Sequence, residues 1–282
     1  MSISSPTLTN PAIAGPTIPW TNSNRSTVRT RRGDMRTVSA ALKSEWIKLT
    51  SLRANKVILV LTAVVGGFIS WALASSAKDH SLTASELFIY PLPLIATLAT
   101  VSGILMITAE AQHGTLAATL TARPGRWVIV TAKTAMAIVV GLVLGATAMV
   151  AGFGGAVLGG VDVGDSSAIP SRALWALLYI ALAAVIGLGV GMIARNSAGA
   201  ISGLLIWSFV LENLLAPTLP HALLHFLPFS AGYRLLDAGA NFKPPVIIAN
   251  ELARAQYALI FGGYALATLA IGTLLLYRRD TN

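Results

Sequence analysis

Residues 108–127 read TAEAQHGTLAATLTARPGRW, and they lie between two long apolar runs at 92–107 and 128–150. A helix needs about 20 consecutive apolar residues to cross a bilayer, and each run with its neighbours is long enough. The stretch between them starts with an acid, Glu110, and closes with a basic turn that contains Pro124. This pattern predicts two membrane-spanning helices joined by an ordered connector.

The composition is typical of an integral membrane protein. Of the 282 residues, 55% are hydrophobic and 11% are charged, and the mean hydropathy is +0.71. A soluble domain has about 25% charged residues, so much of this surface must face lipid. In a soluble protein, the net charge of +9 would suggest a nucleic-acid partner. Here we expect membrane topology to account for the basic residues, and we predict no nucleic-acid partner.

The first 36 residues are rich in Ser, Thr, Pro and Asn and end in a group of arginines. Such a segment buries too little apolar surface to offset the entropy of ordering. We therefore expect residues 1–36 to form a disordered basic tail in the cytoplasm. A mitochondrial targeting leader would have a similar composition. We expect no cleavable signal peptide, because the first apolar run begins only at Val57.

Residues 38–53 predict an amphipathic helix that precedes the spans. Its apolar residues recur at helical spacing on one face: Val38, Leu42, Trp46 and Leu49. Its charged residues lie away from that face: Lys43, Glu45, Lys48 and Arg53. A Trp on the apolar side with basic residues opposite is typical of a helix in the membrane interface. An ordinary cytosolic helix is the alternative.

The fold class that follows is an all-α integral membrane protein with six transmembrane helices. We place the spans at 57–77, 90–109, 127–152, 173–194, 198–216 and 255–277. Only residues 195–197 separate the fourth span from the fifth, so these two are expected to form a tight hairpin. Glycines recur four residues apart in the third and fourth spans, at Gly141, Gly145, Gly187 and Gly191. This spacing allows close helix packing, either within one subunit or at a seam between subunits.

The placement of Lys and Arg predicts that both termini are cytoplasmic. The tail and interfacial helix, the connector, Lys133, the turn at Arg195 and the C-terminus hold 15 of the 20 basic residues. By the positive-inside rule this face is cytoplasmic, and residues 278–282 lie there too. We expect the chain to reside in the plasma membrane.

On the other face, residues 217–254 contain apolar pieces broken by prolines. We expect this segment to dip into the outer leaflet or to cap a cavity. Glu212, beside Asn213, is the one ionisable residue that we take as a serious candidate for function inside the spans. It would line a translocation path, lie at the outer interface or anchor the 217–254 segment.

Little in the sequence points to chemistry. There is no G-x-x-x-x-G-K-[ST] motif, and the glycine-rich piece at 152–160 lacks the lysine that phosphate binding needs. The chain has no cysteine, which excludes thiolate metal sites. His221 and His225 share a helical spacing seen among zinc ligands, but no third ligand is near, and Ser230 with His225 has no supporting motif for a protease. We predict no metal site, no cofactor on this chain and no enzyme activity.

The connector favours a docking surface instead. The helical pattern is interrupted at Gly114, and Thr115 can cap the short helix that follows. Pro124 forces a turn, and Trp127 anchors the next span at the interface. A plain loop whose arginines only enforce topology would not need this ordered helix.

The order of these parts resembles the permeases of ABC-2 type transporters over residues 39–279. The connector residues that carry the resemblance are Glu110, His113, Gly114, Thr115, Arg123, Pro124, Arg126 and Lys133. The stretch SEWIKLTSLR at 44–53 is similar to the start of actinobacterial members of the family. Many members have Arg or Tyr where His113 stands, which puts a fixed ion pair at that position in doubt.

The resemblance implies two permeases, identical or related, that enclose a path, with two separate ATP-binding subunits docked beneath them. ATP and Mg²⁺ would be bound by those partners, and an amphipathic drug, antibiotic or lipid would be exported. The residues implied in coupling are Glu110, His113, Gly114, Thr115, Leu116, Arg123, Pro124 and Arg126, with Leu42, Trp46 and Leu49 on the interfacial helix beside them.

Two other functions stay open at this point. A membrane anchor, or an immunity or regulatory component, could bind a cytoplasmic partner through the same connector without transport. A membrane-embedded enzyme would need a polar site inside the spans, for which the sequence offers almost nothing.

Overall fold

The structure is a computed structural model, and it describes residues 43–47, 53–76, 82–112, 126–236 and 252–279. In these ranges every regular element is a helix. Helices are expected here because lipid offers no partner for a backbone N–H or C=O group, and a helix pairs both within itself.

Six stretches of helix are long and apolar enough to cross a membrane in the part of the chain that the structure describes. They are Asn55–Ser76, Ala84–Gln112, Trp127–Leu158, Ile169–Ala194, Ser197–Leu215 and Arg254–Leu276. Each overlaps one of the predicted spans. The second begins earlier than predicted and the third ends later. The chain is a multi-pass, all-helical membrane protein.

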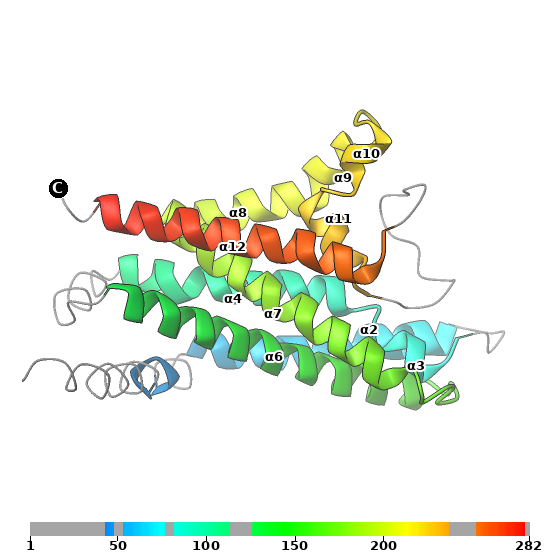
Figure 1. The fold of residues 1–282 in the computed structure, drawn as a ribbon. Helices are drawn as coiled ribbons and strands as arrows, with labels where there is room; N and C mark the ends of the chain where they lie inside the picture. Colours follow the sequence, from blue (N-terminus) through cyan, green and yellow to red (C-terminus); the bar gives the residue numbers. More distant parts are fainter. Residues whose placement is uncertain (1–42, 48–52, 77–81, 113–125, 237–251, 280–282) are drawn as a thin grey trace, which may run out of the picture. The chain divides into compact units, whose positions relative to one another are not determined.

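The helices that form these spans are labelled in Figure 1. The first four spans contain α2 (Arg53–Ser76), α3 (Ala84–Leu87) with α4 (Leu92–Gln112), α6 (Arg126–Leu158) and α7 (Ile169–Ala194). The fifth consists of α8 (Ser197–Ile206), the π-helix η1 (Trp207–Leu211) and α9 (Glu212–Leu215), and the sixth is α12 (Arg254–Arg279). Residues 43–47 form one further helical turn.

Helices α4 and α7 form the centre of the bundle. In the apolar windows of these two spans, 67% and 72% of the residues are buried, against 28% or less in the first, fifth and sixth spans. The outer helices therefore present apolar side chains such as Val60, Phe209 and Leu266 on the surface. Those surfaces are suited to lipid or to another apolar partner.

Glycines bring the central helices into backbone contact. A Cβ atom added at Gly187 of α7 would overlap the carbonyl oxygen of Thr100 in α4, and one added at Gly141 of α6 would lie 2.7 Å from the Cα of Ala181 in α7. At Gly191 it would lie 2.8 Å from the carbonyl oxygen of Ile104. Of the two interpretations of these glycines, packing within one chain is confirmed at these positions.

The turn between α7 and α8 is as tight as predicted. Arg195 closes α7 with φ of 51°, in the left-handed region that commonly ends a helix. Asn196 then caps α8, since its side chain accepts a hydrogen bond of 2.9 Å from the backbone N–H of Gly199. At the same end of the bundle, Gln112 Nε2 donates to Ser197 Oγ over 2.9 Å. This bond joins the end of α4 to the start of α8.

At the opposite end, residues 217–236 fold back onto the bundle. They contain two short helices, α10 (His221–Leu224) and α11 (Pro228–Tyr233). Gly232 of α11 packs against the rings of Tyr179 in α7 and Phe261 in α12, which are 5.4 Å apart between centroids. The segment is thus partly buried, as its broken apolar pattern predicted.

Candidate functional site

The predicted coupling residues fall into two groups. His113, Gly114, Thr115, Leu116, Arg123 and Pro124 lie outside the described residues, as do Leu42 and Leu49 of the predicted interfacial helix. The structure describes Glu110 at the end of α4, Arg126 as the first residue of α6, and Trp46 in the turn at 43–47.

Lys133 is the centre of a buried ion cluster, by which we mean Glu45, Glu110 and Lys133. The Nζ atom of Lys133 donates to Glu110 Oε1 over 2.8 Å and to Glu45 Oε2 over 3.1 Å. A third bond of 3.3 Å reaches the carbonyl oxygen of Met106. An ammonium group has three donors, and all three are used.

The ion cluster is shielded from solvent. Lys133 is fully buried, Glu45 is 6% exposed, and the side chain of Glu110 is 13% exposed. Moving a lysine out of water costs several kcal/mol, which attraction to a partner offsets only where the geometry is good. Two carboxylates and a carbonyl at hydrogen-bond distance meet that condition.

Three separate segments meet at Lys133. Glu110 lies two residues before the end of α4, Lys133 lies in the second turn of α6, and Glu45 belongs to the turn at 43–47. Helices α4 and α6 are the ones that lead into and out of the 113–125 connector. The ion cluster therefore fixes both ends of the connector, and the segment at 43–47, to a single buried point.

Part of this site was expected from the sequence. The resemblance implied Glu110 in coupling, and the structure pairs it with Lys133 on the following helix. The prediction that Glu212 is the one serious ionisable candidate in the spans was wrong, because Lys133 is also fully buried within one. A lysine in the interior of a span requires a carboxylate, and that signal would have pointed to the site.

Glu45 was missed altogether. The periodicity placed it away from the apolar face, and no role was predicted for it. In the structure Glu45 is buried while Trp46 is 53% exposed. Glu45 thus faces the bundle, whereas Lys43, Trp46 and Ile47 are exposed. Exposed Trp46 is still suited to a membrane interface.

A second site lies at the opposite end of the bundle, around Glu212. Glu212 Oε1 accepts a hydrogen bond from the backbone N–H of Phe229, and Glu212 Oε2 accepts one from the backbone N–H of Ser230. Each bond is 2.8 Å long. Glu212 is 3% exposed. The predicted anchoring of the 217–254 segment is thus seen directly, since both bonds hold the first turn of α11.

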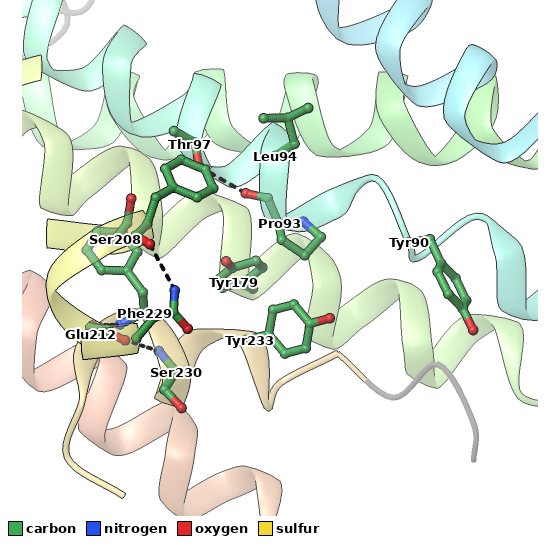
Figure 2. A pocket seen from close by; sticks show the side chains of 12 residues that line it. Tyr90, Pro93, Leu94, Thr97, Tyr179, Ser208, Glu212, Phe229, Ser230 and Tyr233 are labelled. Carbon is green, nitrogen blue, oxygen red and sulfur yellow. Dashed lines mark hydrogen bonds between the residues drawn. The ribbon is translucent and has the colours of Figure 1, made fainter. Parts of the chain in front are cut away.

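Glu212 also lines a cavity of about 500 Å³, which we call the aromatic cavity (Figure 2). Its walls come from α4 and the turn before it, α7, η1, α9 and α11. The lining residues are Tyr90, Pro93, Leu94, Thr97, Tyr179, Ser208, Phe209, Glu212, Asn213, Phe229, Ser230 and Tyr233. Asn213, the other residue predicted for a path, lines the cavity as well, and its Nδ2 donates to the carbonyl oxygen of Phe209 over 2.9 Å. The tyrosines come from three distant parts of the sequence, and no spacing could have joined them.

His225 and Ser230, whose pairing had no supporting motif, have separate surroundings in the structure. His225 Nδ1 lies 3.0 Å from the hydroxyl of Tyr257. Ser230 is among the residues that line the aromatic cavity. Among the described residues, no three His, Cys, Asp or Glu side chains lie close enough to hold a metal ion.

Comparison with known proteins does not identify a family for this chain. No protein-family model matches the sequence, and no curated protein matches it significantly. The ion cluster and the aromatic cavity, at opposite ends of a six-span bundle, are therefore the features from which a function can be proposed.

Proposed function

We propose that this chain is the transmembrane permease subunit of an ATP-binding cassette exporter of the ABC-2 type. A separate P-loop ATPase would dock on the 113–125 connector at the cytoplasmic face of the plasma membrane. A second permease copy, identical or related, would complete the path. The cargo would be amphipathic.

The observation that carries this proposal is the three-way bonding of Lys133. A partner that moves the connector acts on α4 and α6, because the connector begins and ends on them. Glu110 and Lys133 join those helices near these ends, at 2.8 Å, and Glu45 adds the turn at 43–47. Contiguous hydrogen-bonded groups on rigid helices are a physical route for coupling between distant sites. A connector that served only as a loop would not require it.

The distribution of basic residues supports docking of the partner at the cytoplasmic face. The end of the bundle with the ion cluster also holds Arg195 and Arg278, and the sequence predicts most of the basic residues on this face. By the positive-inside rule it faces the cytoplasm, where ATP is available. The sequence has no P-loop of its own, so a partner has to supply ATP hydrolysis.

Co-purification is the first test. The full-length tagged chain is isolated from its native membranes, and the proteins bound to it are identified by mass spectrometry. We expect a P-loop ATPase, and we expect it to be lost when Gly114→Pro is combined with Glu110→Ala. Asp165→Asn is the matched control, because it removes one exposed carboxylate at the other end of the bundle.

Transport is the second test, made with inside-out vesicles that contain the chain and its ATPase. We expect uptake of an amphipathic dye that needs ATP and fails in the Gly114→Pro, Glu110→Ala variant. Unchanged ATPase binding and transport in that variant would contradict the coupling role. Partner binding without any ATP-dependent flux would instead favour the membrane anchor or regulatory component.

A further inference from the structure

The aromatic cavity has a distinctive charge. Of its twelve lining residues, Glu212 is acidic and none is Lys, Arg or His. Burial destabilises an ionised carboxylate, and the two hydrogen bonds that Glu212 accepts from backbone N–H groups offset only part of that cost. A positive group placed in the cavity would offset more of it, whereas a negative group would be repelled.

The walls suit an apolar cation better than a hydrated metal ion. Five of the lining residues are aromatic: Tyr90, Tyr179, Phe209, Phe229 and Tyr233. The electron-rich face of an aromatic ring attracts cations, by about 0.5–2 kcal/mol for each favourable contact. In Figure 2, Glu212 stands at one side of the cavity and Tyr90 at the other, with Tyr179 and Tyr233 between them. A ligand beside Glu212 is therefore within an aromatic enclosure.

The size of the cavity suits a small molecule. The volume of about 500 Å³ is within the range of about 300–1,000 Å³ that is usual for small-molecule sites.

We propose that the aromatic cavity binds an amphipathic organic cation of drug-like size. The positive charge lies beside Glu212, and the apolar body packs on the tyrosine and phenylalanine rings. That this ligand is the exported cargo rests on the proposed function. The binding site itself rests on the residues of the cavity alone.

Two probes of nearly equal size and opposite charge test the proposal: tetraphenylphosphonium and tetraphenylborate. The purified full-length chain is placed in lipid nanodiscs, and equilibrium binding is measured against empty nanodiscs. We expect saturable binding of tetraphenylphosphonium that tetraphenylborate does not displace. Equal binding of both ions, or no saturable binding of the cation, would overturn the proposal.

Variants assign the binding to this cavity. Glu212→Gln should weaken tetraphenylphosphonium binding at least about tenfold, because it removes the buried counter-charge, and Asp165→Asn should leave it unchanged. Tyr233→Leu should weaken binding about threefold to tenfold, while Tyr233→Phe keeps the ring and the affinity. Glu212→Gln also removes charge from the hydrogen bonds that hold α11. If that variant does not fold, the comparison of Tyr233→Leu with Tyr233→Phe still tests the cavity. Equal losses in Asp165→Asn and Glu212→Gln would place the effect outside the cavity.

The two proposals can fail separately. Cation binding to the chain alone needs no ATPase. If binding is found and ATP-dependent flux is not, the cavity assignment stands and the exporter proposal falls. If flux is found and Glu212→Gln and Tyr233→Leu leave cation binding intact, the exporter proposal stands and the cavity assignment falls.

Discussion

Lys133 is held by three acceptors, each from a different chemical group or segment. Glu110 Oε1, Glu45 Oε2 and the carbonyl oxygen of Met106 take its three ammonium hydrogens. If one acceptor is removed, an N–H of the charged ammonium group is left without a hydrogen bond inside an apolar bundle. The free-energy cost of that buried, unpaired N–H is larger than the contribution of the lost bond. The residue is therefore sensitive to changes at distant positions in the sequence.

We expect Lys133→Met to destabilise the protein by about 3–5 kcal/mol, because two carboxylates would lose the cation that compensates them. Lys56→Met is the matched control, since Lys56 is exposed near the start of α2, and its effect should be within about 0.5 kcal/mol. Unfolding by denaturant in micelles measures both.

A variant without any charge in the ion cluster separates two effects of Lys133→Met: the loss of the positive charge and the loss of side-chain packing. Lys133→Met combined with Glu45→Gln and Glu110→Gln leaves no uncompensated charge, and it should recover part of the stability lost by Lys133→Met alone. A triple variant less stable than the single one would show that the ion cluster is not held by charge compensation.

Among the elements, α7 has the closest contacts. It packs through Gly187 against the backbone of α4, and a Cβ at that position would overlap the carbonyl oxygen of Thr100. Small residues at such contacts let helices approach closely where no hydrophobic effect separates protein from lipid.

Gly187→Ala should therefore destabilise the bundle by about 1–3 kcal/mol through overpacking. Gly154→Ala offers a control at an exposed position near the C-terminal end of α6, where an added Cβ meets nothing within 4 Å. There the substitution should be neutral or stabilise the protein by up to about 1 kcal/mol, since Ala has the higher helix propensity. Thermal unfolding in detergent is the measurement. Equal destabilisation by both would mean that the α4–α7 contact is not as close as described.

The elements also show where sequence reasoning was sufficient. The six spans follow from the lengths of the apolar runs, because a span has to be about 20 residues long whatever it packs against. The early start of the second span was not predicted. There the Glu86 side chain accepts a hydrogen bond of 3.3 Å from the backbone N–H of Thr83 at the start of α3, a single turn that precedes the predicted span.

The ion cluster could be predicted only in part, because it depends on how helices are rotated. Periodicity correctly separated Glu45 from the side of Trp46. It could not show which side faces the bundle, since both a lipid-facing and a core-facing surface of a membrane helix are apolar. Glu45 and Lys133 are 88 residues apart in sequence, and their pairing results from tertiary packing.

At the scale of the whole molecule, the two sites lie at opposite ends of the bundle. Lys133 is near the ends of α4 and α6 that face the connector, and Glu212 is at the far end of the fifth span. If the exporter proposal holds, the first site is at the cytoplasmic face and the second is toward the outside.

This arrangement can be tested by labelling, because the chain has no cysteine of its own. Ser166→Cys and Arg278→Cys each introduce one thiol at opposite ends, and the unchanged chain is the blank. In intact cells, a membrane-impermeant maleimide should label Ser166→Cys and should reach Arg278→Cys only after permeabilisation. The reverse pattern would invert the topology, and it would place the connector away from ATP.

The hydrogen bond between Gln112 and Ser197 has a consequence for how the two ends communicate. The fifth span has only 17% of its apolar window buried, so few side chains hold it along its length. It is hydrogen-bonded at its two ends, to the end of α4 by Ser197 and to α11 by Glu212. Between these ends, Ala200 and Leu204 pack against Ile104 of α4. A shift of α4 beside the connector would therefore move the fifth span with it and displace Glu212 in the wall of the aromatic cavity.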